Sequence, residues 1–200
     1  MMALYRAKTT GVGDYVDISM FESVLNASPN IVGPVFGGNA VPERLSERTH
    51  GGNAMLNIYE VKENNFIALG GGEHKFVKEL FEGLGRPEFI DPVTGPAGEG
   101  HWPAIKFLRD EFLKEDKLDW EEWFDGKDIC WMHVCDLKEA WDSPQVWERQ
   151  MRVKDPDGND HIGIPIKFMN EPGRINFALP NHGEHSKEIL ETLNYDDGEI

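Results

Sequence analysis

Glycine and proline are concentrated in one stretch of this chain, residues 29–52. Both residue types interrupt helices and strands, so the stretch predicts an extended linker. A connection this long without secondary structure is uncommon inside a compact domain. We therefore expect the 200-residue chain to be divided at this linker, and not to fold as one compact domain.

The sequence before the linker predicts short elements. Residues 1–7 indicate a helix that begins without a capping residue or a polar lead-in, as the end of a longer helix would, so we expect sequence upstream of it. The alternation at residues 15–18 predicts a short strand. Ser19 and Glu22 have the spacing of a capping box, which predicts the start of another helix.

The sequence after the linker alternates between strand and helix signals without a strand–helix–strand series. Residues 55–61 and 66–69 predict two strands joined by a turn at residues 63–65. Apolar residues at helical spacing predict helices over 76–84 and 105–112. This order predicts an α+β fold and argues against a complete nucleotide-binding sheet.

Several shorter elements are predicted in the rest of the chain. They are a short helix capped by Asp119 with Glu122, a buried strand at 129–134, helices that begin at Asp136 and at Ser143, strand-like segments at 150–153 and 162–168, and a last helix over 186–193.

The chain is strongly acidic, and its charge excludes several partners. It has 20 Lys and Arg against 36 Asp and Glu, a formal net charge of −16. Nucleic-acid binding requires clustered basic residues, so we expect no nucleic-acid partner. An anionic membrane surface is excluded for the same reason. No apolar run is long enough to span a bilayer, and the first residues lack the pattern of a secretory signal.

Two cysteines, Cys130 and Cys135, have no spacing typical of a metal site or of a disulfide framework. Their apolar neighbours predict buried free thiols, which suits the reducing cytoplasm. His182 and His185 lie in a polar loop without further ligands nearby, so we expect no metal. Five tryptophans are expected to pack in the core, Trp120, Trp123, Trp131, Trp141 and Trp147.

The segment from Gly70 to His74 is the strongest candidate site. Gly70, Gly71 and Gly72 lie between a predicted strand and a predicted helix, where free backbone N–H groups can bind an anion or an oxyanion. Glu73 and His74 are both able to move protons. The alternative is a flexible loop whose glutamate suits the dipole of the helix. The residues alone favour this alternative modestly.

Several segments, in this order, resemble family III CoA-transferases (the CaiB/BaiF family) and the related α-methylacyl-CoA racemases. They are RAKTTGVGDYVDISM from Arg6, GGNAMLNIYEVKENNFIALGGGEHKFVKELFEGLGRPEF from Gly51, WEEWFDGKDICWMHVCDLKEA from Trp120 with SPQVWERQM after it, and GEHSKEIL from Gly183. Together they cover nearly the whole chain. The resemblance is to the C-terminal part of the family.

The resemblance implies a domain organisation and a homodimer. Residues 1–50 would be the end of a large Rossmann-like domain and an outgoing linker. Residues 51–152 would be a small α+β domain, and residues 153–200 a return linker and the closing segment of the large domain. Two subunits of such proteins interlock like the links of a chain.

The resemblance also implies chemistry on acyl-CoA. The transferases move CoA between two carboxylic acids, through an aspartate that attacks the thioester. Gly70, Gly71 and Gly72 match the loop that closes over this site in the partner subunit, with His74 beside it. Glu73 matches a glutamate that supports an acid–base pair in the racemases. CoA is then a substrate, and no permanently bound cofactor is expected.

The aspartate that the family uses lies before the first residue of this chain, so the chain alone is expected to be inactive. Asp14 and Asp17 follow that position and do not match it. Met55 and Leu56 replace aromatic residues common in the racemases, which favours a transferase. Two alternatives stay open: part of an α-methylacyl-CoA racemase, and a non-catalytic subunit that completes an active site on another chain.

Overall fold

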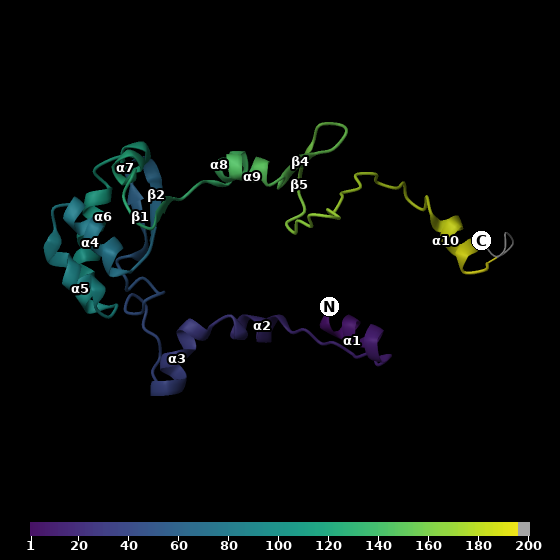
Figure 1. Ribbon diagram of the computed structural model, residues 1–200, viewed down its shortest axis with the longest axis horizontal. Coiled ribbons are helices and arrows are strands. Elements are labelled where there is room, and N and C mark those ends of the chain that lie inside the picture. Colours follow the sequence, from purple (N-terminus) through teal and green to yellow (C-terminus); the bar gives the residue numbers. More distant parts are fainter. Residues whose placement is uncertain (196–200) are drawn as a thin grey trace. The chain divides into compact units, whose positions relative to one another are not determined.

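A computed structural model describes residues 1–195 of the chain, except for the side chain of Asn30 (Figure 1). The chain divides into two compact units, Met1–Val134 and Cys135–Ile200. Residues 196–200, which belong to the predicted closing segment, lie outside the described residues. The fold is α+β, as the sequence predicts.

The first unit begins with three helices, α1 (Met2–Thr10), α2 (Met20–Asn26) and α3 (Pro29–Gly38). The predicted cap of α2 is confirmed, because the Ser19 side chain accepts a hydrogen bond from the N–H of Glu22. Residues 15–18 were expected to form a strand, and this prediction is wrong. In the described part of the chain no strand pairs with them, and a strand needs such a partner.

The predicted extended linker is also wrong in its first ten residues, which form α3. Pro29 is the first residue of the helix, where its fixed φ angle is favourable and its missing N–H costs nothing. Pro34 lies inside the helix, a placement that the sequence alone argues against. Residues 39–52 contain turns without a helix or strand.

An antiparallel sheet with the strand order β1-β2-β3 follows, of which β1 and β2 are labelled in Figure 1. Strands β1 (Leu56–Val61) and β2 (Asn65–Gly70) form the predicted hairpin, in register from Leu56 opposite Gly70 to Val61 opposite Asn65. The turn is a short 3-10 helix, η1 (Lys62–Asn64). The edge strand β3 (Trp131–His133) is shorter and more exposed than the predicted buried strand, because an edge strand is paired on one side only.

Helices pack around this sheet to form a compact body, residues 54–133, which is called the small domain below. They are α4 (His74–Gly83), α5 (Ile90–Thr94), α6 (Trp102–Phe112) and α7 (Lys117–Phe124), with two short 3-10 helices, η2 (Pro87–Phe89) and η3 (Glu99–His101). Asp116 caps α7, and not Asp119 as predicted. Its carboxylate accepts hydrogen bonds from the N–H groups of Leu118 and Asp119, so the helix starts three residues earlier.

The core of the small domain lies between the sheet and these helices. Helix α6 contacts β1 and helix α7 contacts β2. The rings of Tyr59 and Phe112 are 5.2 Å apart, and Trp120 packs edge-on against Phe112 at 4.9 Å. The prediction of core tryptophans is thus confirmed for Trp120, whereas Trp147 is exposed.

The two cysteines are free, but they are not buried as predicted. Cys130 is exposed and Cys135 is half-buried. Cys130 precedes the edge strand β3, and its backbone carbonyl accepts a hydrogen bond from the N–H of Gly70. Apolar neighbours in the sequence do not bury a side chain at the edge of a sheet.

The second unit contains α8 (Leu137–Asp142), α9 (Pro144–Glu148), the hairpin of β4 (Arg152–Lys154) with β5 (Asp160–Ile162), and α10 (Ser186–Thr192). The predicted start of α8 is confirmed by a complete capping box between Asp136 and Glu139. The predicted start of α9 is confirmed as well, with Pro144 as its first residue.

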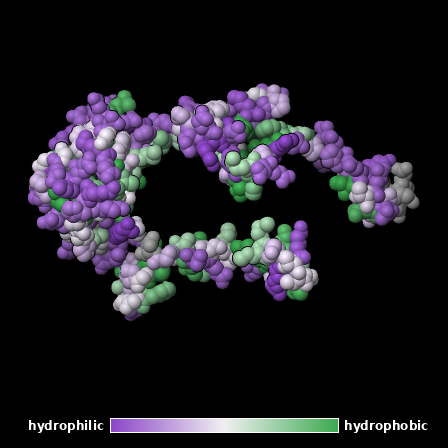
Figure 2. Space-filling view, in the orientation of Figure 1, coloured by the Kyte–Doolittle hydropathy of each residue, from purple (hydrophilic) through white to green (hydrophobic). Residues whose placement is uncertain are grey.

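Large apolar side chains are exposed along the first two helices. They include Leu4, Tyr5, Met20, Phe21, Val24 and Leu25, and neither helix has a buried residue. Figure 2 shows apolar surface along the segment that carries α1 and α2, whereas the body of the small domain is mostly hydrophilic on this face. Contiguous exposed apolar surface of this kind marks a protein or membrane interaction site or a ligand-binding groove.

Candidate functional site

The glycine loop connects the end of β2, at Gly70, to the start of α4, at His74. The N–H of Gly70 donates to the carbonyl of Cys130 at 2.9 Å. This hydrogen bond holds the start of the loop against the residue that precedes β3. Gly71 is buried, and a Cβ atom there would lie 2.6 Å from Cδ2 of Phe76 and 2.8 Å from Cβ of Cys130. Only glycine fits at this position without displacing its neighbours.

Gly72 and Glu73 lie on the open side of the loop. Both are exposed, and a Cβ atom on Gly72 would have its nearest neighbour at 3.9 Å, the Nδ2 of Asn53. Glu73 is the N-cap residue of α4, and its carbonyl accepts hydrogen bonds from the N–H groups of Phe76 and Val77. Its side chain does not cap the helix, so the carboxylate is available to a ligand.

The start of α4 presents backbone donors. Within residues 1–195, the N–H groups of His74 and Lys75 have no hydrogen-bond acceptor, as is usual for the first turn of a helix. Such groups and the helix dipole favour a negative charge close to them. An oxyanion or a carboxylate is the kind of group that this end of α4 can stabilise.

A cavity of about 400 Å³ adjoins the loop. Gly72 and Glu73 form one wall, and the segment 93–97 forms another. Arg48 and Asn53 also line it. The cavity therefore combines an acidic side chain, a basic side chain and an amide beside the open glycine. The sequence pattern did not identify Arg48 or Asn53. Arg48 lies in the predicted linker, and Asn53 lies between that linker and the predicted strand at 55–61.

Two buried polar side chains hold the walls of this cavity. The Oδ1 of Asn53 accepts a hydrogen bond from the N–H of Met55 at 2.8 Å. His101 is fully buried, and its Nδ1 accepts a hydrogen bond from the N–H of Ala54 at 3.2 Å. Its Nε2 is 3.2 Å from the carbonyl of Gly95, which is the geometry of a neutral ring that donates from Nε2. His101 thus ties the wall at Gly95 to the start of β1.

The structure brings together only some of the predicted site residues. Gly72 and Glu73 line the cavity, and Gly70 and Gly71 position them. His74 is exposed as the first residue of α4 and does not line the cavity. A proton transfer by His74 therefore has less structural support than one by Glu73.

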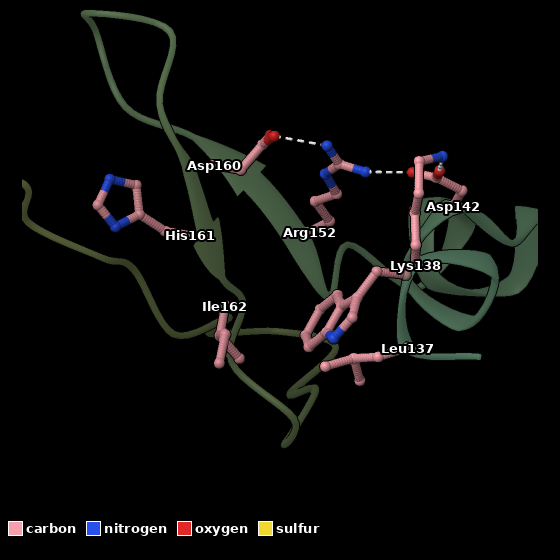
Figure 3. Close-up of a pocket in the computed structure, with 8 residues that line it drawn as sticks. Leu137, Lys138, Asp142, Arg152, Asp160, His161 and Ile162 are labelled. Carbon is pink, nitrogen blue, oxygen red and sulfur yellow. Dashed lines mark hydrogen bonds and ion pairs between the residues drawn. The ribbon is translucent and has the colours of Figure 1, made fainter.

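The second unit has a separate cavity of about 670 Å³ (Figure 3). Leu137, Trp141 and Ile162 give it an apolar lining. Figure 3 shows Arg152 between two carboxylates, with hydrogen bonds to Asp142 at 2.6 Å and to Asp160 at 2.5 Å. This cavity contains none of the residues that the sequence predicts for the site.

These ion pairs shift the acidity of the carboxyl groups. The hydrogen bond from Arg152, with a second one from Lys154, lowers the pKa of Asp160 to about 2. The pKa of Asp142 is lowered chiefly by Lys138 and then by Arg152. Both carboxyl groups are solvent-exposed, and solvent screens such ion pairs. The pairs therefore contribute little to the stability of the fold, although they lower the two pKa values.

Residues 1–195 contain no group of three or more His, Cys, Asp or Glu side chains placed to hold a metal ion. Within the same residues, every helix is too short or too polar to cross a membrane.

Solved structures share this fold. A CAIB/BAIF family protein from Brucella suis superimposes with a TM-score of 0.69 at 20% identity, over 96% of this chain and 51% of that one. Rv3272 from M. tuberculosis gives a TM-score of 0.67 at 15% identity, over 93% of this chain and 48% of that one. At these identities the likeness concerns the fold.

Curated relatives match the entire chain. They include the human α-methylacyl-CoA racemase, 26% identical over 202 residues, and the L-carnitine CoA-transferase of Proteus mirabilis (strain HI4320), 26% identical over 216 residues. The (R)-2-hydroxy-4-methylpentanoate CoA-transferase of Clostridioides difficile is 22% identical over 213 residues. The chain spans about half the length of these relatives, 52% in each case.

The family model of CoA-transferase family III matches residues 1–186, which is most of the chain. The matched range includes the glycine loop with Gly72 and Glu73. The chain belongs to CoA-transferase family III.

Proposed function

We propose that this chain is the C-terminal part of an acyl-CoA:carboxylate CoA-transferase, which moves CoA from a thioester to a carboxylic acid. The observation that carries the proposal is the glycine loop: in a member of this family, it places free backbone donors and Glu73 beside a cavity. The two free thiols suit a cytoplasmic enzyme. CoA enters as a substrate, without a permanently bound cofactor.

The loop has a defined task in this proposal. Attack on a thioester moves negative charge onto the carbonyl oxygen, and that oxyanion needs hydrogen-bond donors. The N–H groups of His74 and Lys75 supply such donors at the start of α4. Gly72 leaves space for the ligand to approach the backbone. Arg48, across the cavity, would attract a carboxylate.

The nucleophilic aspartate that the family resemblance implies is, in this proposal, supplied by a segment outside these 200 residues. The half-length match to the curated relatives supports it. The exposed apolar side chains of α1 and α2 support it too, because a further segment or a second subunit would cover them. We propose an assembly of two such subunits, each completed by an N-terminal half.

A complementation assay tests the proposal. The 200-residue chain is mixed with a separately produced N-terminal half from the same source, and CoA transfer from an acyl-CoA to a carboxylic acid is followed by mass spectrometry. We expect transfer by the mixture and none by either part alone. Transfer by the 200-residue chain alone contradicts the proposal, because a nucleophile would then lie within it.

An α-methylacyl-CoA racemase is the second candidate. Glu73 at the loop favours it, and the human racemase is as similar to this chain, at 26% identity, as the L-carnitine CoA-transferase is. A racemase exchanges the α-proton and needs no acceptor acid. Incubation of the mixture with a 2-methylacyl-CoA in D2O distinguishes the two. Deuterium at the α-carbon without an acceptor acid identifies a racemase, and transfer without exchange identifies a transferase. A third possibility is a non-catalytic subunit that only restores activity to a catalytic partner. In that case Glu73→Gln would leave the activity of the mixture unchanged.

A further inference from the structure

A third cavity, of about 520 Å³, lies between α6 and the preceding residues 43–51. Trp102, Lys106 and Arg109 line it from α6, with Arg44 and Leu45 on the opposite side. These three α6 residues are spaced by four and then three positions, so they share one face of the helix. Its lining differs from that of the cavity at the glycine loop.

The loop side of this cavity is held in a defined conformation. The indole N–H of Trp102 donates to the carbonyl of Leu45 at 3.0 Å, and the N–H of Leu45 donates to the carbonyl of His50 at 2.8 Å. Leu45 has a φ of 68°, which is unfavourable for a leucine. Gly51 allows it, because a Cβ atom there would lie 2.9 Å from Cδ2 of Leu45. Backbone strain held in place by several contacts is typical of ligand sites.

Positive charge gathers here although the chain carries a net charge of −16. Three basic side chains, Arg44, Lys106 and Arg109, face one acidic lining residue, Glu43. Lys106 forms an ion pair with Asp110 at 2.8 Å. Among the described residues, Arg44 and Arg109 form no ion pair, so both guanidinium groups are free to bind an anion.

An aromatic surface accompanies this charge. Trp102 is 46% exposed while its indole N–H is fixed to Leu45, so one part of the ring is held still and open to solvent. Buried Ile105 forms an apolar floor. Fixed aromatic rings stack on planar groups, and guanidinium groups bind phosphate through paired hydrogen bonds. The volume is within the usual range of small-molecule sites, about 300–1,000 Å³.

We propose that this cavity binds a nucleoside phosphate, with the base stacked on Trp102 and the phosphates held by Arg44 and Arg109. A free nucleotide and the nucleotide end of a CoA molecule share this chemistry. The site does not depend on the proposed transferase reaction, because binding to the 200-residue chain is measured without activity.

The indole signal of Trp102 in a ¹H–¹⁵N NMR spectrum of the 200-residue chain reports binding, and Trp102→Phe assigns it. We expect ADP to shift this signal saturably. Arg44→Gln and Arg109→Gln are each expected to weaken ADP binding about tenfold, since each removes a charge-assisted contact. Lys114→Gln is the matched control, because it removes the same charge just beyond the end of α6 and outside the cavity. The indole signal of buried Trp120 checks that each variant is folded.

Three further titrations separate the possible results. Inorganic phosphate and adenosine are each expected to bind more weakly than ADP. Coenzyme A binding more tightly than ADP assigns the site to CoA, and equal or weaker binding assigns it to a free nucleotide. The proposal is overturned if ADP gives no saturable shift, if phosphate binds as tightly as ADP, or if the arginine variants weaken binding no more than Lys114→Gln does.

Discussion

Gly71 and Phe76 are in such close contact that a methyl group on Gly71 would lie 2.6 Å from Cδ2 of the Phe76 ring. The first turn of α4 therefore packs directly on the loop that precedes it. Phe76 and Cys130 together leave no space for a side chain at Gly71, whereas space is available at Gly72. The glycines are thus not equivalent: one is required for packing and the next for access.

The variants Gly71→Ala and Gly72→Ala separate these two roles. Gly71→Ala is expected to destabilise the small domain by about 1–3 kcal/mol, because the added methyl group overpacks the contact with Phe76 and Cys130. Gly72→Ala is expected to change the free energy of unfolding by less than about 1 kcal/mol, because space is available and its φ is not positive. Urea unfolding followed by tryptophan fluorescence measures both. Equal destabilisation by the two variants contradicts the packing role.

Glu73→Gln tests whether the carboxylate of the loop takes part in the reaction. If Glu73 moves a proton, kcat of the complemented enzyme is expected to fall about 100-fold, at the low end for a general acid or base. Stability should not change, since the side chain is exposed and does not cap α4. Glu82→Gln is the control, because Glu82 lies on the same helix, remote from the cavity lining. A fall of less than threefold assigns Glu73 no part in proton transfer.

Much of the small domain could be predicted because its signals are local. The hairpin follows from alternation around a turn with two residues of positive φ, Glu63 and Asn64. The helix of residues 74–83 follows from apolar residues at helical spacing, of which Val77, Leu80 and Phe81 are buried. Each of these features is decided by neighbours in the sequence, so the chain reveals it without a structure.

The errors in prediction have a different physical origin. Pro29 suggested a linker but begins a helix, because proline favours the first helical position as much as it opposes the interior. The alternation at residues 15–18 suggested a strand, but a strand depends on a partner that the sequence does not specify. Arg48 and Asn53 reach the candidate cavity through the folding of a loop with no periodic pattern, so no sequence signal identifies them.

His101 provides a test of how the cavity beside the glycine loop is held. His101→Phe keeps a ring of similar size but removes both hydrogen bonds. The buried N–H of Ala54 then has no partner, whereas the carbonyl of Gly95, an exposed residue, can bond to water. We expect a loss of about 1–3 kcal/mol in the free energy of unfolding, which is the cost of one unsatisfied buried group. Chemical denaturation measures the loss.

The exposed Thr49–His50 contact offers a matched control for His101. His50→Phe replaces another histidine with the same ring but removes no buried hydrogen bond, so it should change stability by less than about 1 kcal/mol. If His101→Phe is no more destabilising than His50→Phe, the ring of His101 does not hold the wall at Gly95.

The hairpin of β4 and β5 is expected to weaken in acid. Hydrogen bonds from Arg152 and Lys154 lower the pKa of Asp160 from 3.8 to about 2. A carboxyl group whose pKa is lower in the folded state stabilises that state above its unfolded pKa. This contribution is therefore complete above pH 3.8 and is lost as the pH falls through about 2. The carboxyl carbon of Asp160, followed by NMR during an acid titration, measures the pKa directly.

Arg152→Gln tests the cause of this shift. Arg152 is the larger contributor and Lys154 the smaller, so Arg152→Gln should raise the pKa of Asp160 further toward 3.8 than Lys154→Gln does. Arg152→Gln should also raise the pKa of Asp142, but only in part, because Lys138 remains as its principal partner. If Arg152→Gln leaves the pKa of either carboxyl group unchanged, or if Asp160 has an ordinary pKa in the unaltered chain, the guanidinium does not bridge the two carboxylates in solution.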